Sequence, residues 1–352
     1  MKVALDVMGS DLGPEPIIKG GILAAKKENI EVILVGQQEK IKKILKKYNI
    51  KNLPVFIKHA PEIVKMDESP SKAIKNKKNS SMAVGLKLLK DGNSKAFISA
   101  GNTGAVLGYS IFILKRLKNI IRPAIAATLP SVNGYVVMLD VGGNVNCKPE
   151  HLVQFAVMGS VFAKIELGMD NPRVCLLSNG EEESKGIDVL KKTHTLLEKS
   201  SLNYIGFKEG RDVFEGNADV FVCDGFVGNI SLKLAEGLGK TLLELLKTNI
   251  YSSFFRKLGA FFLKGMIRDI KKKFDYREYG AAPLIGVNEI VMISHGSSDE
   301  KAIYNAIKKA KTLIEKDFNK KLGDEIERNM DLERNIWRAF KDKIFHYKEG
   351  EA

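Results

Sequence analysis

The stretch that decides the fold is Val220-Phe221-Val222-Cys223-Asp224-Gly225-Phe226-Val227-Gly228-Asn229, and apolar residues follow it at helical spacing. Its first part is a short apolar run typical of a buried strand, and its second part is a glycine-rich turn that leads into a helix. In α/β proteins such turns bind ligands, because the N–H groups at a helix N-terminus point outward and glycine allows close approach. Asp224 adds a carboxylate to this anion-binding turn, which favours a catalytic site.

Three further segments have the same build, a strand-like run followed by glycine beside Asn, Asp or Lys. They are Ala96–Ser99 with Gly101-Asn102-Thr103-Gly104, Tyr135–Leu139 with Asp140-Val141-Gly142-Gly143-Asn144-Val145-Asn146, and Val174–Leu177 with the loop from Ser178 to Lys185 and Gly186. One glycine pattern alone is a weak signal. Four in one chain favour a functional site over ordinary strand-to-helix turns.

These runs also carry a family resemblance. The chain resembles the bacterial phosphate acyltransferases of phospholipid synthesis in the runs Ser99–Ala105, Asn179–Glu183 and Asp224–Asn229 and in the segment from Tyr279-Gly280-Ala281-Ala282 to Ser294-His295-Gly296. The similarity extends from Asp6-Val7-Met8-Gly9 almost to the C-terminal helix. Ser10 and Ala281 stand where the family has glycine, which affects only local backbone freedom.

The resemblance implies an enzyme that moves a long-chain fatty acyl group from acyl carrier protein to inorganic phosphate. The products are acyl phosphate, a precursor of phosphatidic acid, and the free carrier thiol. The resemblance also implies a homodimer, and a membrane-embedded glycerol-3-phosphate acyltransferase that receives the acyl phosphate. We expect no cofactor.

The composition is that of a globular protein whose basic charge indicates either an anionic partner or no partner at all. Hydrophobic residues make up 44% of the 352 residues, and the formal charge is +14. A basic surface attracts nucleic acid, acidic carrier proteins or anionic membranes, and a lysine-rich proteome alone also explains it. The sequence contains no zinc-finger spacing, RNA-recognition run or basic zipper, so we expect no nucleic-acid partner.

Cysteine and histidine usage indicates a reducing compartment and no metal. Cys147, Cys175 and Cys223 lie far apart without CxxC spacing, so we expect neither disulfides nor zinc. The histidines other than His295 have no carboxylate or cysteine at metal-ligand spacing. No signal sequence or spanning run is evident, so we expect a cytoplasmic protein.

Strand-like runs alternate with helical segments along the chain. This alternation predicts an α/β fold, with a mainly parallel sheet flanked by helices on both faces in a Rossmann-like three-layer arrangement. The strands are expected at Val3–Val7, Val32–Val35, Val55–Ile57, Ala96–Ser99, Tyr135–Leu139, Val174–Leu177 and Val220–Cys223, with a further strand-like run at Ile290–Ile293 before His295, and the clearest helices at Ile17–Lys27, Ile41–Tyr48, Met82–Leu89, Leu152–Leu167 and Ile230–Leu246. Without a flexible linker or a repeat, residues 1–352 are expected to form one catalytic unit, possibly with two lobes.

Residues 249–277 interrupt this alternation of strands and helices. They are expected to form an amphipathic helical insertion that protrudes. Its apolar contact residues are Phe254, Phe255, Leu258, Phe261 and Phe262, and its cations include Lys271, Lys272 and Lys273. Such a helix lies in a membrane interface with its cations on anionic lipid, or packs against a dimer mate or the protein core. The resemblance favours peripheral membrane association. A final segment, Ile326–Phe345, carries Trp337 and is expected to pack as a helix or an oligomer contact.

Acyl transfer from a thioester to phosphate needs an anion pocket, donors for an oxyanion, and a proton for the departing thiolate. Asp224 is the candidate acid–base residue, with capping of the following helix as the alternative. The other catalytic candidates are Asn229, Lys185 and His295, although a histidine that only shapes its loop fits equally well. The candidates for phosphate and substrate binding are Asp6, Gly9, Ser99, Gly101, Asn102, Thr103, Gly104, Asn144, Asn146, Gly225, Gly228 and Lys233.

Three other functions compete with this hypothesis. A phosphotransacylase that uses acyl-coenzyme A has the same chemistry, and the sequence barely separates the two donors. A nicotinamide-dependent dehydrogenase is disfavoured because Gly9-Ser10-Asp11-Leu12-Gly13 does not have the G-x-G-x-x-G spacing. A nonenzymatic protein that binds nucleic acid or membrane through charge leaves the four glycine-rich turns unexplained.

Overall fold

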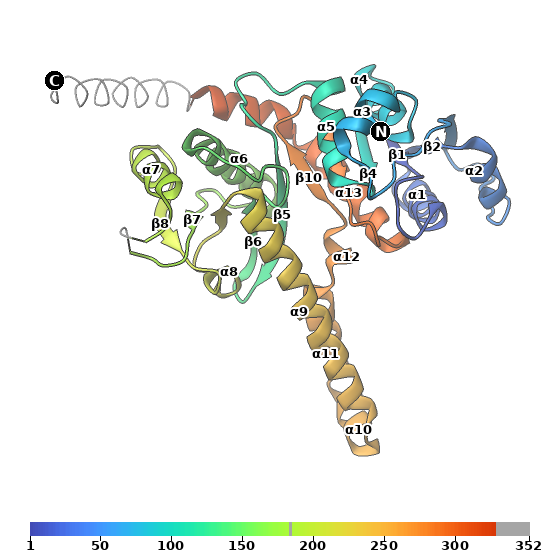
Figure 1. The fold of residues 1–352 in the computed structure, drawn as a ribbon. Coiled ribbons are helices and arrows are strands. Elements are labelled where there is room, and N and C mark those ends of the chain that lie inside the picture. Colours follow the sequence, from blue (N-terminus) through green and yellow to red (C-terminus); the bar gives the residue numbers. More distant parts are fainter. Residues whose placement is uncertain (183–184, 329–352) are drawn as a thin grey trace.

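A single eleven-stranded sheet runs through the protein in the order β3-β2-β1-β4-β11-β10-β5-β6-β9-β7-β8 (Figure 1). It is seen in a computed structural model that describes residues 1–182 and 185–328. The strands are β1 (Lys2–Asp6), β2 (Glu31–Gly36), β3 (Val55–His59), β4 (Ala96–Ser99), β5 (Ala124–Ser131), β6 (Gly134–Leu139), β7 (Val174–Leu177), β8 (Tyr204–Lys208), β9 (Val220–Val222), β10 (Ala282–Ile285) and β11 (Ile290–Ile293).

Strand direction divides the sheet into two halves. Strands β3, β2, β1, β4 and β11 are mutually parallel, and so are β6, β9, β7 and β8. Between the halves, β10 pairs antiparallel with both β11 and β5, and β5 pairs antiparallel with β6. Because the direction reverses three times from β11 to β6, the carboxyl ends of the two halves lie at opposite edges of the sheet.

Helices cover both faces, so the predicted three-layer α/β fold with a mainly parallel sheet is confirmed. One core holds α1 (Pro14–Glu28), α6 (Pro149–Leu167) and α13 (Glu300–Glu315) against one face, with α2 (Gln38–Leu45) and α7 (Asp188–Leu197) at its ends. The other core holds α3 (Pro70–Asn76), α4 (Ser81–Lys90), α5 (Thr103–Leu114) and α8 (Asp212–Glu215).

Three strands escaped the sequence analysis, namely β5, β8 and β10. The sequence of β5 is Ala-Ile-Ala-Ala-Thr-Leu-Pro-Ser, in which alanine and proline both disfavour strands. It is nevertheless buried throughout and lies in the middle of the sheet. Tertiary burial therefore overrides a weak local preference there.

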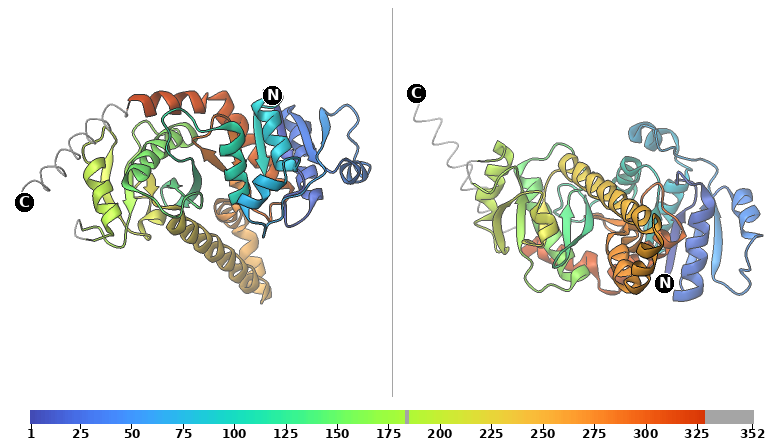
Figure 2. Two further views of the ribbon diagram at one scale, coloured as in Figure 1. Left: turned by 45° about the horizontal axis from the view of Figure 1, so that its top comes forward. Right: turned by 90° about the horizontal axis from the view of Figure 1, so that it is seen from below.

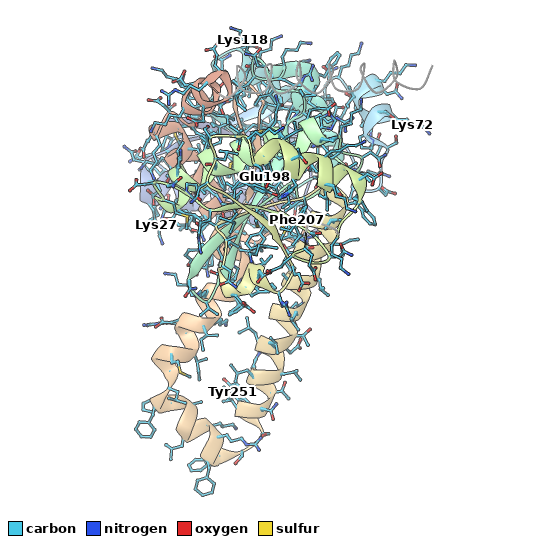
Figure 3. All side chains as sticks on the ribbon, turned by 90° about the vertical axis from the view of Figure 1, so that its left-hand side faces the viewer. Lys27, Lys72, Lys118, Glu198, Phe207 and Tyr251 are labelled. Atoms are coloured by element: carbon cyan, nitrogen blue, oxygen red, sulfur yellow. The ribbon has the colours of Figure 1, made fainter. Side chains whose placement is uncertain are left out.

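The expected protrusion is a helical hairpin that is longer than the predicted insertion 249–277. Its first arm is the distal part of α9 (Gly225–Tyr251), and α10 (Phe254–Phe262) and α11 (Lys264–Phe274) return to the body (Figures 1 and 2). Helix α9 crosses residue 249 without a break, so the hairpin also includes residues before 249. None of the side chains of α10 and α11 is buried, and Figure 3 shows both arms standing clear of the body, with Tyr251 far out on one of them.

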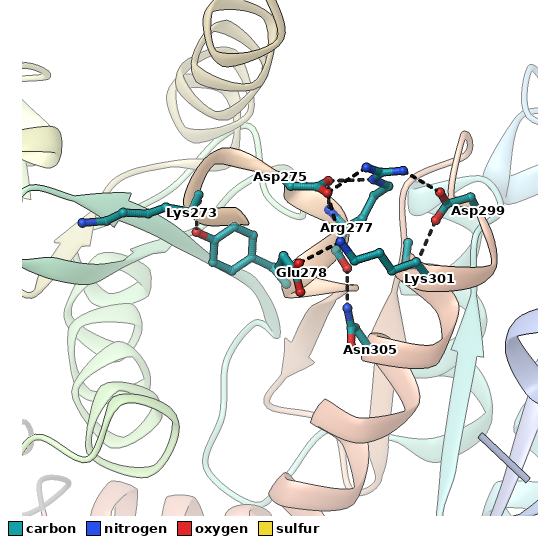
Figure 4. Close-up of polar contacts among 9 residues, drawn as sticks. Lys273, Asp275, Arg277, Glu278, Asp299, Lys301 and Asn305 are labelled. Carbon is teal, nitrogen blue, oxygen red and sulfur yellow. Dashed lines mark hydrogen bonds and ion pairs between the residues drawn. The ribbon is translucent and has the colours of Figure 1, made fainter. Parts of the chain in front are cut away.

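A network of ion pairs closes the base of this hairpin (Figure 4). Arg277 in α12 (Tyr276–Tyr279) donates to Asp275 at 2.7 and 2.8 Å and to Asp299 at 2.9 Å. Lys301 pairs with Asp275 at 3.1 Å and with Glu278 at 2.7 Å. Because Asp299 is the N-cap of α13, the network ties the hairpin to the body.

Within the described ranges, no helix is long and apolar enough to span a bilayer. The predicted C-terminal helix that carries Trp337 lies almost entirely outside the described residues.

Candidate functional site

The first group of candidate residues lies in the loops after β1, β4 and β11, which are parallel neighbours in the sheet. Asp6 and Ser99 end their strands in register, and the Ser99 hydroxyl donates to Asp6 Oδ2 at 2.7 Å. Both residues are buried, and burial raises the pKa of Asp6 although Ser81, Ser99 and two backbone amides stabilise its charge. They therefore lie behind the loops and support them.

Close backbone packing explains two glycines of this group. A Cβ on Gly9 would lie 2.7 Å from Asp6 Oδ2 and 2.9 Å from the Cα of Gly101. The Gly101 N–H donates to Ser99 Oγ at 3.1 Å. The loops after β1 and β4 thus approach each other more closely than side chains there would allow.

Asn102 organises the start of α5. Its Oδ1 accepts the Ala105 N–H at 2.9 Å, so it is the N-cap, and its amide donates to the carbonyls of Met66 and Glu68 at 2.7 and 3.0 Å. Within the described residues, the N–H groups of Thr103 and Gly104 make no hydrogen bond. Two amides of this helix N-terminus are therefore available to an anion.

His295 lies close to both the first group and α9. Burial lowers the pKa of its imidazole, and the nearby charge of Lys233 lowers it further, against Glu236 and Asp11. The ring Nδ1 lies 2.7 Å from the Ser297 hydroxyl. Because the Ser294 N–H donates to the Ser99 carbonyl at 2.8 Å, the His295 loop lies beside the loop that begins α5. His295, Lys233 and the α5 N-terminus therefore form one end of the site, where Lys233 is paired with Glu236 at 2.9 Å.

The second group lies after β6 and β9, where the loop 140–146 packs against the first turn of α9. The Gly225 N–H donates to the Asn144 carbonyl at 2.7 Å, and a Cβ on Gly228 would overlap the carbonyl of Asp140. Asn144 is buried, and its amide donates to Asp140 Oδ2 and to the Pro123 carbonyl. Gly225, Gly228 and Asn144 hence join the loop to the helix.

Asp224 caps α9, and the structure shows what its carboxylate does locally. Oδ1 accepts the N–H groups of Phe226 and Val227 at 2.9 and 3.0 Å. The Gly228 N–H donates to the Asp224 carbonyl, so with Gly225 all four first-turn amides are bonded. Among the described residues, Oδ2 of Asp224 has no hydrogen bond. That oxygen is the one able to take part in proton transfer.

The remaining candidates lie near the second group. Asn229 is exposed on α9, and a Cβ on Gly142 would lie 3.7 Å from its side chain. Lys185 is exposed in the loop after β7, whose last residues are in register with the end of β9. Asn146 is exposed, and its carbonyl accepts a hydrogen bond from Arg122 at 3.0 Å.

Helix α9 connects the two groups, which lie at opposite edges of the sheet. Lys233 follows Asp224 by nine residues, about 13 Å at 1.5 Å per residue, which brings it back to the edge that holds His295. Helical side chains lean toward the N-terminus, so Asn229 and Lys233 lean toward the Asp224 turn. The two groups therefore bound one continuous path along α9.

Asp140 and Asp11 are two residues near these groups that the sequence analysis did not select. Asp140 is fully buried at the end of β6, and Asp11 lies beside the His295 loop, where its N–H donates to the Gly296 carbonyl. The available signal for Asp140 was its place directly after a strand and before glycine, the same place that Asp224 holds. No comparable signal marks Asp11.

Comparison with known proteins gives consistent relationships over nearly the whole chain. The family described as "Fatty acid synthesis protein" matches residues 1–321. The phosphate acyltransferase of Geobacter sulfurreducens is 46% identical over 344 residues, covering 98% of this chain and 99% of that protein. That of Geotalea uraniireducens is 48% identical, covering 94% and 96%.

Solved structures share the fold at lower sequence identity. A phosphotransacetylase from Streptococcus pyogenes has a TM-score of 0.61 at 18% identity, covering 89% of this chain and 94% of that one. A phosphotransacetylase from Staphylococcus aureus has a TM-score of 0.58 at 17% identity, with the same coverage.

Proposed function

Because the chain belongs to the fatty acid synthesis protein family, we propose that it transfers a long-chain acyl group from acyl carrier protein to inorganic phosphate for phospholipid synthesis. The observation that carries this proposal is the match to phosphate acyltransferases over 98% of the chain. An acyltransferase of this kind joins a phosphate oxygen to the thioester carbon and breaks the carbon–sulfur bond. The proton of hydrogen phosphate ends on the carrier thiol, so atoms and charge balance without a cofactor.

The two residue groups divide this work. The free amides of Thr103 and Gly104, with Lys233, hold negative charge of the phosphate. Asn229 and His295 supply donors beside the reacting oxygens. Oδ2 of Asp224 passes the proton to the departing sulfur.

Asp224→Asn separates this role from helix capping. Asn is as good an N-cap as Asp, so the variant keeps the first turn of α9. Without a carboxylate that carries a proton, kcat is expected to fall by roughly 10²- to 10⁴-fold. Full activity with an unchanged melting temperature would assign Asp224 to capping alone.

The activity itself is tested by phosphate-dependent release of thiol from palmitoyl-acyl carrier protein, with hydroxylamine trapping of acyl phosphate. Palmitoyl-coenzyme A runs in parallel, because the same chemistry serves either donor. Product from the carrier substrate alone supports the proposal. Product from coenzyme A alone establishes the phosphotransacylase alternative, and no trapped product from either donor refutes both.

The acidic carrier suits the charge of this protein. The chain has a formal charge of +14, and opposite charge accelerates encounter and makes it dependent on ionic strength. The proposal therefore includes a KM for the carrier substrate that rises with salt. A KM for the carrier substrate that does not change between low and physiological salt would contradict this electrostatic attraction.

We also propose that a second copy of the chain packs against α9 in a homodimer. Its exposed apolar residues Ile230, Leu234, Leu238, Leu242 and Leu245 follow each other at three- and four-residue spacing, so they form one stripe along the helix. Leu234 is 71% exposed, although it is a large apolar residue in the middle of a helix. A homodimer that buries two such stripes against each other removes this apolar surface from water.

Light scattering of Leu234→Glu tests the dimer. The variant is expected to be monomeric, while Lys247→Glu, on the opposite side of the same helix, stays dimeric. A monomeric parent protein would refute the dimer, and a dimeric Leu234→Glu would exclude this stripe as its interface.

The distal hairpin supports peripheral membrane contact. Phe254, Phe255, Phe261 and Phe262 are each at least 68% exposed around the tip, and Lys271, Lys272 and Lys273 are exposed or half-buried in the last turn of α11, toward the base of the hairpin. Exposed aromatic rings and cations on the same hairpin favour an interface of anionic lipid. A membrane-bound glycerol-3-phosphate acyltransferase is the alternative partner for the same surface.

Co-sedimentation with vesicles tests the lipid contact and distinguishes it from nonspecific attraction by the net charge of the protein. Neutralising Lys271, Lys272 and Lys273 to glutamine is expected to weaken binding to anionic vesicles. The control neutralises three exposed lysines, Lys40 and Lys43 of α2 and Lys46 directly after it, which removes the same charge from the body. Equal loss in both triple variants, or in neither, counts against a specific membrane-facing hairpin.

A further inference from the structure

Asp140 is a buried carboxylate at the centre of the second residue group. It follows β6 directly and has no exposed surface. Oδ1 accepts the N–H groups of Ile125 and Gly143 at 2.9 and 3.0 Å, and Oδ2 accepts the Asn144 amide at 2.9 Å. Both carboxylate oxygens are therefore bonded to groups of the loop 140–146 or of the neighbouring strand β5.

These bonds continue to the first turn of α9. Asn144 uses its side chain on Asp140 and on the Pro123 carbonyl, and its own carbonyl accepts the Gly225 N–H at 2.7 Å. Gly225 directly follows Asp224. One unbroken chain of hydrogen bonds thus links the Asp140 carboxylate to the peptide that carries the proposed proton-transfer residue.

Backbone packing strengthens the link. A Cβ on Gly225 would lie 3.0 Å from Asp140 Oδ2, and the Asp140 N–H donates to the Cys223 carbonyl at 3.0 Å. Asp140 hence touches the segment on both sides of Asp224. Rotation or sliding of the first turn of α9 would break contacts with the same buried residue.

We propose that Asp140 is a positioning residue for acyl transfer, which holds the Asp224 turn through Asn144 and Gly225 so that Oδ2 of Asp224 faces the departing thiol. The inference rests on the proposed role of Asp224 in proton transfer. Asp140 is buried and does not reach the substrate. A misplacement of about 1 Å at a reacting group lowers rates by as much as roughly 10²-fold, so a support of this kind governs kcat.

Asp140→Asn tests the proposal. The amide has a single acceptor oxygen, so its NH₂ group faces either the Asn144 amide or the two backbone N–H donors. We expect kcat to fall by roughly 10²-fold, while KM for phosphate changes by less than about threefold, because the proposed anion site, at Lys233 and the α5 N-terminus, lies nine residues along α9 from Asp224. The matched control is Asp212→Asn, since Asp212 is nearly as buried and also bonded to a backbone N–H, but lies on α8. This control should keep the parent kcat.

Combination with Asp224→Asn separates positioning from general destabilisation. If Asp140 acts through Asp224, adding Asp140→Asn to Asp224→Asn lowers kcat by less than about threefold further, because residues that act as one unit are not additive. Full additivity of the two losses, or a parent-like kcat in Asp140→Asn, overturns the positioning role. Full activity in Asp224→Asn alone instead removes the proposed function of Asp224, and the positioning role falls with it.

Asn144→Ala is the second variant, for use if Asp140→Asn does not fold. It leaves the Asp140 carboxylate on the Ile125 and Gly143 amides and removes the side-chain hydrogen bonds of Asn144 to Asp140 and to the Pro123 carbonyl, so Asp140 loses its link through Asn144 to the Asp224 turn. The same loss of kcat, and the same lack of additivity with Asp224→Asn, are expected. A parent-like kcat in Asn144→Ala overturns the inference.

Discussion

Gly228 is the position where the packing of α9 on the β6 loop is most sensitive to one added methyl group. An alanine Cβ there would overlap the carbonyl of Asp140 and lie 2.9 Å from Cys223 Sγ. The carbonyl belongs to the backbone, so no side-chain rotation relieves the overlap. Gly228→Ala therefore moves either α9 or the loop 140–146.

Gly237 of the same helix is the matched control. A Cβ there meets nothing within 4 Å. Alanine is favoured over glycine inside a helix by about 1 kcal/mol, so Gly237→Ala is expected to raise the free energy of unfolding by about that amount. Overpacking costs about 1 to 3 kcal/mol, so Gly228→Ala is expected to lower it. The two variants should differ by about 2 to 4 kcal/mol.

Differential scanning calorimetry checks this difference. With about 2.1 cal/mol/K of unfolding entropy per residue, a chain of 352 residues changes its melting temperature by about 1.4 °C for each kcal/mol. The expected separation of the two variants is thus about 3 to 5 °C. Light scattering confirms that both variants keep the oligomeric state of the parent.

Activity provides the second measurement. A displaced α9 moves Asp224, so kcat of Gly228→Ala is expected to fall by as much as roughly 10²-fold, whereas Gly237→Ala stays close to the parent. Equal melting temperatures and equal kcat values for the two variants would refute the argument that close contact between α9 and the Asp140 loop sets the geometry of the site.

Three further predictions follow from charge and burial. Lys233→Gln is expected to raise the pKa of His295, because burial and the lysine charge both lower it; an imidazole NMR titration with no upward shift would contradict their proximity. Burial opposes ionisation of Asp275, yet hydrogen bonds from Arg277 and Lys301 lower its pKa. The ionised carboxylate therefore stabilises the fold at pH values above its ordinary pKa of about 3.9. This contribution is lost as the pH falls through the lower pKa of the folded state. Arg277→Met should weaken that pH dependence below about pH 4 in denaturant unfolding, and an unchanged profile would contradict it. Burial, and then the charges of two aspartates, raise the pKa of Cys147 to about 12. Iodoacetamide at pH 8 should therefore label this thiol more slowly in the native protein than in urea. Equal labelling rates, measured by peptide mass spectrometry, would contradict the raised pKa.

Local patterns were enough to predict the fold class and to place the candidate residues in the turns that follow buried strands. Apolar runs followed by glycine mark β4, β6, β7 and β9, because buried parallel strands need apolar side chains and the turns after them need small residues. The same patterns missed β5, whose alanines have little preference for strands. Its position in the sheet depends on burial between β10 and β6, which is a property of the whole fold.

The sequence by itself determined that Asp224 begins a helix after a buried strand, because strand and cap preferences act over a few neighbouring residues. Only the tertiary structure decided that the glycine-rich turns divide between opposite edges of the sheet, since that depends on three antiparallel pairings around β10 and β5. It also decided that Asp140 supports the Asp224 turn, and that Lys233 returns to His295 along α9. Contacts between residues more than 60 positions apart leave no periodicity in a single chain, so packing alone reveals them.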